Sequence, residues 1–112
     1  MQIAHRSYRN TDVLDISGQF NFGTRKEFAA ALEKIKQSGG TQIILNFKLV
    51  TFVDSAAIGL LALAAQQFKL TNCKLSLVGS QGTVKQVLTL AHIDQMIPTF
   101  ANEDLAIGAR AA

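Results

Sequence analysis

The chain is predicted to fold as a single α/β domain over residues 1–112, with a mostly parallel central sheet and an antiparallel first strand. Strand-like segments alternate with segments of helical period, in the order β-β-α-β-α-β-α-β-α. The segment TQIILNF, residues 41–47, is nearly continuously apolar, as is typical of a strand buried on both faces of a parallel sheet. No proline- or serine-rich linker interrupts the chain, and 112 residues suit one domain.

Two strands and a helix are predicted before this buried strand. An Asn-Thr-Asp turn at residues 10–12 joins the strands, and the second strand runs toward Gly18. The segment TRKEFAAALEKIKQSGG, residues 24–40, is the clearest helix because its apolar side chains recur at helical spacing. Thr24 is placed to cap the start of this helix, and the glycine pair at 39–40 is placed to end it.

A second helix is predicted over residues 56–70. A short link that holds Val50 and Phe52 leads into it from the buried strand. Its apolar face is formed by Ile58, Leu61, Ala65 and Phe68. The seam between strand and helix reads FVDSAAIGLL, and it contains an acid and a hydroxyl side by side.

The last part of the chain repeats the alternation of strand and helix. KLSLVG, residues 74–79, is predicted to be a strand, and TVKQVLTLAHI, residues 83–93, an amphipathic helix. Pro98 precedes a short strand or turn near Phe100. Asn102, followed by two acidic residues, is a predicted cap for a C-terminal helix.

Composition and charge argue against several classes of function. The net charge of +3 is mild, the 11 basic residues are scattered, and the chain has one tyrosine and no tryptophan. We therefore expect no direct binding to nucleic acid. The lone Cys73 cannot form an internal disulfide, and no spacing of Cys and His residues suggests a metal site. We expect neither a metal nor another cofactor.

The hydropathy pattern predicts a cytoplasmic protein without a membrane segment. No signal peptide is recognisable at the start of the sequence. The longest apolar stretch, residues 56–65, is about half of what a membrane span needs. A free cysteine fits a reducing compartment.

Two motifs that often carry chemistry are poor matches here. The turn GSQGTVK, residues 79–85, has neither of the glycine spacings that bind nucleotide phosphates, so its glycines are interpreted as supplying unusual backbone angles. His5 and His92 have no evident partner for a catalytic triad, and His92 is interpreted as contacting the end of its helix. We therefore expect a protein that is not an enzyme.

The pair Asp54-Ser55 remains the strongest candidate site. Either residue is a favoured helix cap, worth about 1 kcal/mol, and a plain cap is one interpretation of the pair. However, if Asp54 caps the helix, the Ser55 hydroxyl stays available. Ala56, Ala57 and Gly59 keep the surroundings low enough for another protein to approach, and a helix N-terminus readily accommodates a phosphate.

These residues also carry a family resemblance. The segment LNFKLVTFVDSAAIGLLALAAQQF, residues 45–68, resembles the central signature of STAS domains, specifically the bacterial anti-sigma-factor antagonists. ISGQFNFGTRKEF, residues 16–28, is similar to the second strand and first helix of the subgroup whose partner system is a response-regulator-linked kinase and phosphatase. CKLSLVGSQGTVKQVLTLAHIDQMIPTF, residues 73–100, is similar to the closing strand, helix and strand of the family.

The resemblance implies a function and a modification site. In that family the anti-sigma factor is itself a serine kinase that phosphorylates the serine of the motif, and a metal-dependent serine phosphatase restores it. By position, Ser55 would be the acceptor and Asp54 its acidic neighbour. Asn21 stands where many relatives have an aspartate. The asparagine amide keeps the hydrogen-bonding capacity of that side chain but lacks its negative charge.

The expected contact surface combines the first turn of the second helix with the end of the preceding strand. Its candidate members are Gln19, Asn21, Phe22, Asp54, Ala56 and Ala57. Phe20 and Phe22 are each open to two interpretations, as contact or as core, and Ile58 favours the core. We expect the unmodified protein to bind the anti-sigma factor and a phosphate on Ser55 to release it.

Two other interpretations remain open at this point. STAS-like subunits also serve as structural partners in larger assemblies such as membrane transporters, in which case Ser55 would be only a helix cap. Alternatively, Ser55 could be a nucleophile, which requires a nearby base that the sequence does not supply.

Overall fold

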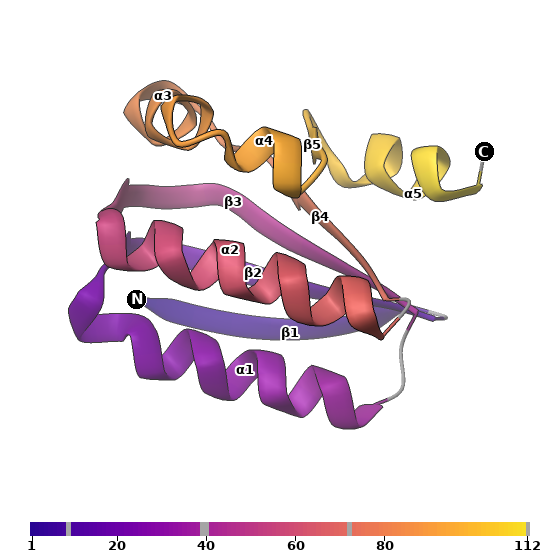
Figure 1. The fold of residues 1–112 in the computed structure, drawn as a ribbon. Helices are drawn as coiled ribbons and strands as arrows, with labels where there is room; N and C mark the ends of the chain where they lie inside the picture. The colour runs from indigo at the N-terminus through magenta and orange to yellow at the C-terminus, as the bar shows by residue number, and fades with distance from the viewer. Residues whose placement is uncertain (9, 39–40, 72, 112) are drawn as a thin grey trace.

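The computed structural model describes residues 1–8, 10–38, 41–71 and 73–111, and these form an α/β fold around one five-stranded sheet (Figure 1). The strands lie in the order β1-β2-β3-β4-β5, with β1 antiparallel to β2 and the other neighbours parallel. The predicted fold class and the antiparallel first strand are thereby confirmed. The elements are β1 (Gln2–Tyr8), β2 (Thr11–Phe20), η1 (Phe22–Thr24), α1 (Arg25–Ser38), β3 (Gln42–Val53), α2 (Ser55–Leu70), β4 (Lys74–Val78), α3 (Gly82–Leu90), α4 (Ile93–Met96), β5 (Thr99–Phe100) and α5 (Glu103–Ala111).

The main core lies between the sheet and the helices α1 to α4. Phe20, Phe28 and Phe47 are completely buried there, and the ring of Phe20 lies 4.6 Å from that of Phe28 between centroids. Leu61 and Phe68 bring the buried face of α2 into the same core. Because consecutive parallel strands are neighbours, each connecting helix returns across this face of the sheet. The site-bearing helix α2 is therefore fixed along its length by apolar packing.

The opposite face of the sheet is covered mainly by α5. Ala106 of this helix packs with Val13, Ile44 and Val78 in a second, smaller apolar cluster. Asn102 caps α5 as predicted, because its Oδ1 accepts a hydrogen bond of 2.9 Å from the Leu105 N–H. The C-terminal helix therefore closes part of a face that the other helices leave open.

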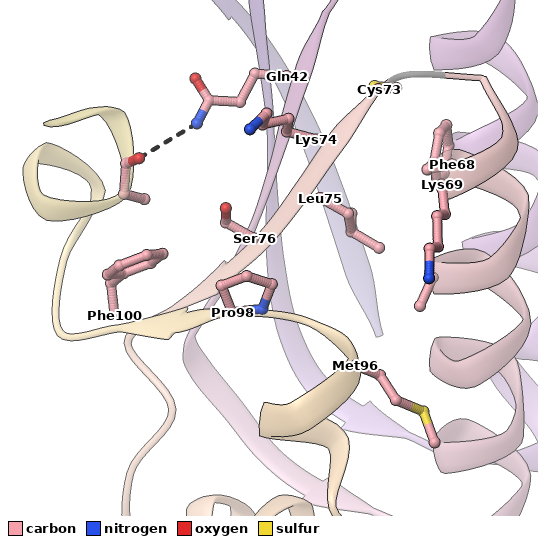
Figure 2. Close-up of a pocket in the computed structure, with 12 residues that line it drawn as sticks. Gln42, Phe68, Lys69, Cys73, Lys74, Leu75, Ser76, Met96, Pro98 and Phe100 are labelled. Atoms are coloured by element: carbon pink, nitrogen blue, oxygen red, sulfur yellow. Dashed lines mark hydrogen bonds between the residues drawn. The ribbon is translucent and has the colours of Figure 1, made fainter. Parts of the chain in front are cut away.

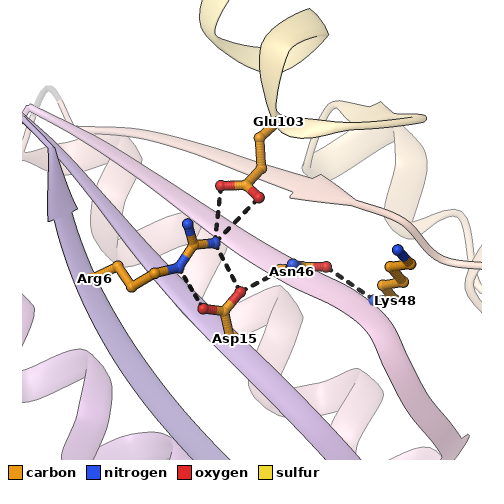
Figure 3. Close-up of polar contacts among 5 residues, drawn as sticks. All are labelled: Arg6, Asp15, Asn46, Lys48 and Glu103. Atoms are coloured by element: carbon orange, nitrogen blue, oxygen red, sulfur yellow. Dashed lines mark hydrogen bonds and ion pairs between the residues drawn. The ribbon is translucent and has the colours of Figure 1, made fainter.

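A polar network on this second face joins β1, β2, β3 and α5 (Figure 3). The Arg6 guanidinium donates to Asp15 Oδ1 at 2.9 Å and to Glu103 Oε1 at 3.0 Å. Asn46 Nδ2 also donates to Asp15 Oδ1, at 2.9 Å. These hydrogen bonds from Arg6 are the main reason why the pKa of Asp15 lies below its ordinary value. The network fixes the start of α5 over the sheet.

Several predicted boundaries differ from the structure. Thr11 and Asp12 belong to β2, where they pair with Tyr8 and Ser7, so the hairpin turn comes earlier than the predicted turn at residues 10–12. The predicted link with Val50 and Phe52 is the continuation of β3, which runs to Val53. Pairing with β2 continues through two register shifts, and this continued pairing keeps the segment extended.

The helices also differ from the prediction in two places, and a third expectation is not tested. Thr24 belongs to a short 3₁₀-helix before α1, and Asn21 caps that 3₁₀-helix. The predicted helix over residues 83–93 is divided at His92, whose backbone adopts a left-handed conformation with φ 60°. The predicted helix end at residues 39–40 lies outside the described part of the chain.

Candidate functional site

The candidate site lies where β2 and β3 end and α2 begins. In parallel α/β sheets such strand ends meet helix N-termini at one edge, which is where binding sites of this class are usually found. Asp54 is the N-cap of α2, with an extended backbone, and its Oδ1 accepts a hydrogen bond of 2.9 Å from the Ala57 N–H. Asp54 Oδ2 accepts a second bond, of 3.0 Å, from the Phe22 N–H. One carboxylate therefore joins the start of α2 to the chain that follows β2.

These hydrogen bonds stabilise the ionised form of Asp54. The pKa of its carboxyl group is lowered from the ordinary value of 3.8, first by the backbone hydrogen bond from Ala57 and also by that from Phe22. The positive end of the α2 dipole acts in the same direction. Asp54 is therefore negatively charged at neutral pH while it performs a structural task.

Ser55 is the first residue of α2, and its side chain is exposed. Because Asp54 supplies the cap, the Ser55 hydroxyl makes no hydrogen bond to any residue that the structure describes. Ala56 is half-buried and Gly59 is exposed, with open space around its α-carbon. The Ser55 hydroxyl is thus surrounded by small residues, so a second protein can reach it.

Ala57 does not belong to the accessible surface, contrary to the expectation from the sequence. Its side chain is completely buried, because it lies on the same face of α2 as Leu61 and Phe68, which packs against the main core. Its role at the site is carried by the backbone, whose N–H donates to Asp54. Ile58, interpreted as core, is partly buried and packs against the core.

The chain after β2 forms the second part of the site. The Asn21 side chain accepts a hydrogen bond of 3.2 Å from the Thr24 N–H, and the Thr24 hydroxyl accepts one of 3.0 Å from the Asn21 N–H. This reciprocal capping box fixes the turn beside Asp54. Gln19 is exposed, and its Oε1 lies 3.5 Å from Asn21 Nδ2. Asn21 is thus occupied with local structure, with its remaining donor directed to Gln19.

The two phenylalanines open to either interpretation have opposite roles. Phe20 is completely buried in the main core, whereas Phe22 is 60% exposed. The Arg25 guanidinium lies 3.6 Å above the ring centroid of Phe22 and donates to the Phe22 carbonyl at 2.6 Å. A cation held over an aromatic ring in this way fixes the orientation of the ring. Phe22 is therefore presented to solvent in a defined position.

Two further apolar side chains at this end of the sheet were missed from the sequence. Phe52 is 48% exposed and lies opposite Gln19 in the β2–β3 pairing, and Leu49 is 66% exposed on the same strand. We call the three exposed side chains Phe22, Leu49 and Phe52 the apolar rim. Strict alternation along the strand would not have found them, because Val50 and Val53 are both buried although they are three residues apart. The pairing of β2 with β3 has register shifts in this stretch.

Neither His5 nor His92 forms a hydrogen bond with Ser55 in the described structure. His5 Nε2 lies 2.7 Å from Asp12 Oδ1 across the β1–β2 pair, and the Ser7 hydroxyl donates to the same Asp12 oxygen at 3.0 Å. The structure thus gives His5 partners that the sequence did not reveal. His5 Nε2 also lies 3.4 Å from the Ser7 hydroxyl, so the same ring nitrogen contacts both Asp12 and Ser7. In a catalytic triad the two ring nitrogens contact different partners.

No group of three or more His, Cys, Asp or Glu side chains in the described part of the chain is arranged to hold a metal ion. Within the same residues, no helix has the length and apolar character needed to cross a membrane.

Fold and site together define a small α/β domain whose exposed chemistry gathers at one strand-to-helix junction. Residues 2–106 match the family model of the STAS domain, so the chain belongs to that family. A STAS-domain containing protein of Pseudomonas aeruginosa is 25% identical over 83 residues, which make up 74% of this chain and 81% of that protein.

Solved structures share the fold at low sequence identity. An anti-sigma factor antagonist from Mycobacterium paratuberculosis superposes with a TM-score of 0.89 at 16% identity, covering 99% of this chain and 94% of that chain. SpoIIAA in its unphosphorylated form, an anti-sigma factor antagonist, gives 0.80 at 19% identity, covering 99% and 98%. The phosphorylated form, described as a Bacillus cell fate determinant, gives 0.72 at 22% identity, covering 99% and 100%. A sulfate transporter family protein from Wolinella succinogenes gives 0.78 at 18% identity, covering 91% and 85%.

Proposed function

We propose that this protein is a cytoplasmic anti-sigma-factor antagonist, a non-enzymatic binding protein switched by phosphorylation of Ser55. In the unphosphorylated form it binds an anti-sigma factor that is also a serine kinase. Phosphorylation by that kinase releases the protein, and a metal-dependent serine phosphatase restores binding. The observation that carries the proposal is the exposed hydroxyl of Ser55, which has no hydrogen-bond partner among the described residues because Asp54 supplies the helix cap.

The expected binding surface surrounds Ser55 with polar and apolar groups. Gln19, Asn21, Asp54 and Ala56 supply polar and small contacts, and Phe22 supplies an exposed aromatic ring. Phe52 and Leu49 complete the apolar rim. Large aromatic side chains are enriched among the residues that contribute most to the binding energy of protein interfaces.

A phosphate on Ser55 would act on binding and leave the fold intact. It adds about −1.5 to −2 charges at pH 7. The N-terminus of α2 favours this charge by about 0.3–1 kcal/mol, so the helix tolerates it. A partner that covered the same group would have to remove its water shell beside the ionised Asp54, which is costly when the charge is unpaired. The modified protein therefore keeps its structure and loses its partner.

The direct test is to incubate the purified protein with ATP and the serine kinases encoded beside its gene, and to map phosphate by mass spectrometry. We expect phosphate on Ser55 and none in Ser55→Ala. Ser80→Ala is the matched control, because Ser80 precedes another helix of the same sheet and its loss should leave phosphorylation unchanged. Phosphate on a different residue would contradict the proposal.

A binding experiment separates the switch from the alternative of a fixed subunit in a larger assembly. The likeness to the transporter-family structure extends to the fold and makes that alternative worth testing. We expect Ser55→Glu to weaken binding to the kinase at least tenfold and Ser55→Ala to bind like the wild type. Equal binding by the wild type and Ser55→Glu would favour the fixed subunit.

A further inference from the structure

A cavity of about 410 Å³ lies at the other end of α2 from Ser55, beside an incompletely paired stretch of β4 (Figure 2). We call it the edge cavity. β5 pairs only with Leu77 and Val78, so residues 74–76 of β4 have no strand partner from β5 on that side. The volume falls within the range of about 300–1,000 Å³ that is usual for small-molecule sites.

One buried polar group in the edge cavity has no partner. Ser76 is 6% exposed, and its hydroxyl makes no hydrogen bond to a described residue. Every completely inaccessible polar side-chain atom of the described residues does have a partner, so the Ser76 hydroxyl must be reachable from the cavity. Gln42, the other buried polar residue there, differs, because Thr11 donates to its Oε1 and its Nε2 donates to the Ala106 carbonyl. The Ser76 hydroxyl is therefore available to hydrogen-bond a polar group that enters the cavity.

The charge around the edge cavity has one sign. Lys69 and Lys74 line it, no acidic side chain does, and neither lysine forms an ion pair with a described residue. Figure 2 shows Lys74 on the same side of β4 as Ser76, and Lys69 on the facing helix. Ser76 and Lys74 thus share the α5 face of the sheet, whereas Lys69 lies across β4 on the α2 side. A hydroxyl donor beside an unpaired cation suits an anionic group of the ligand.

The backbone of β4 adds a donor on the same side. The Leu77 N–H donates to the Pro98 carbonyl at 2.9 Å and the Gly79 N–H to Phe100 at 3.2 Å. Because alternate residues of a strand direct their amides to the same neighbour, the Leu75 N–H points to this side as well. It lies before the start of the pairing with β5.

The rest of the edge cavity is apolar. Phe68 and Leu75 are buried side chains of its wall, Met96 is 53% exposed at its border, and Phe100 closes the side toward α5. Inorganic phosphate would leave this apolar surface in contact with water. A ligand with an apolar body and a single anionic group would cover it and gain from its burial.

We propose that the edge cavity binds a small monocarboxylate with an apolar body. Its carboxylate accepts hydrogen bonds from Ser76 and Lys74 on the α5 face of the sheet. Its apolar body passes over the unpaired edge of β4 to Leu75, Phe68 and Met96 on the α2 side. This site is separate from Ser55, so its occupation does not depend on the phosphorylation switch.

Octanoate is the probe of choice, titrated into isotope-labelled protein and followed by backbone amide NMR shifts. We expect saturable shifts confined to residues around Leu75, Ser76 and Phe100, with none at Ser55. Octanol, which has the apolar body without the charge, should bind at least tenfold more weakly. Inorganic phosphate should produce no saturable shift. Equal affinity for octanol, or shifts scattered over exposed apolar side chains, would overturn the proposal.

Two variants test the polar contacts independently. Lys74→Gln and Ser76→Val should each weaken octanoate binding about tenfold, since each removes a hydrogen bond to a charged group. Lys85→Gln on α3 is the control, because Lys85 does not line the edge cavity and its loss should leave affinity unchanged. Lys74→Gln is on an exposed position and is expected to fold normally, so unchanged octanoate affinity in that variant would refute the assignment.

Discussion

Two strand-to-helix junctions of the same sheet are built in different ways. At the β3–α2 junction Asp54 caps the helix with its side chain, and the next residue presents a hydroxyl to solvent. At the β4–α3 junction Gln81 occupies the N-cap position without a side-chain cap bond, and its amide donates to the Lys48 carbonyl at 3.1 Å. At the first junction the Ser55 hydroxyl is exposed and not needed for capping. At the second junction the Gln81 side chain attaches the loop to β3 through its hydrogen bond to Lys48.

Glycines do at the second junction what Asp54 does at the first. Gly79 and Gly82 have φ values of +77° and +59°, which side-chain-bearing residues rarely adopt. This confirms the interpretation of the glycine-rich turn as a conformational feature. A strand-to-helix junction can therefore be stabilised by backbone geometry, as at Gly79 and Gly82, or by a capping carboxylate, as at Asp54. At the first junction the capping carboxylate leaves the neighbouring Ser55 hydroxyl exposed at the first turn of the helix.

The largest expected effect comes from breaking the glycine-based junction. Gly79→Ala should lower the free energy of unfolding by about 2–3 kcal/mol, because a left-handed backbone and a crowded side chain add together. A β-carbon there would lie 3.1 Å from the Lys48 N atom. Gly82→Ala should cost only about 1 kcal/mol, since that position has the positive φ and open space. Urea unfolding measures both, and equal losses would show that crowding at Gly79 is unimportant.

The second effect comes from removing the capping carboxylate. Asp54→Ala should lower the urea midpoint by less than Gly79→Ala does, because it removes the bonds to Ala57 and Phe22 without straining the backbone. Gln81→Ala is the matched control at the other junction, where no cap bond exists to lose. A fall in the Gln81 variant as large as in the Asp54 variant would mean that capping does not distinguish the junctions.

The cap should also give the first junction a pH dependence. The pKa of Asp54 is lower in the folded state than in the unfolded chain. Its contribution to stability is therefore complete above the unfolded pKa, and is lost as the pH falls from about 5 through the lower folded pKa. Asp54→Asn should thus be less stable than the wild type at pH 7, and the gap should narrow near pH 3. A gap independent of pH would assign the effect to packing.

The smallest expected effect on stability is that of Ser55→Ala. Its hydroxyl has no partner in the described structure, so the free energy of unfolding should change by no more than about 0.5 kcal/mol. The same variant should lose all phosphorylation, which separates function from stability at this position. A loss of stability close to that of Asp54→Ala would mean that Ser55 shares the capping role.

Much of the fold could be predicted from local pattern. The continuous apolar run in β3 predicted a buried parallel strand, and the alternation of strands and helices predicted the layer order. The errors fell where pairing overrides local preference. Thr11 and Asp12 carry turn-like side chains, yet Asp12 lies in β2 and accepts from Ser7 across the hairpin. Asp and Thr side chains favour turns because they hydrogen-bond nearby backbone groups there. A partner on the neighbouring strand removes that advantage.

The candidate site was predicted unevenly for a related reason. Adjacent positions in the sequence gave Asp54 and Ser55, whose roles depend on the first turn of one helix. The burial of Ala57 and the exposure of Phe52 depend on what packs against each residue, and residue type alone does not specify it. The edge cavity was not predicted either, because it exists only where β5 stops short beside β4.

The order of strands and helices and the helix cap at Asp54-Ser55 are encoded locally, because both follow from periodicity and side-chain chemistry within a few residues. Which polar groups find partners depends on the folded arrangement. It gave Asp54 a second bond from Phe22 and His5 a contact with Asp12, and it left Ser55 and Ser76 with none among the described residues. The physical reason is that a hydrogen bond needs two groups in contact, and most of these contacts join segments that are distant in the chain.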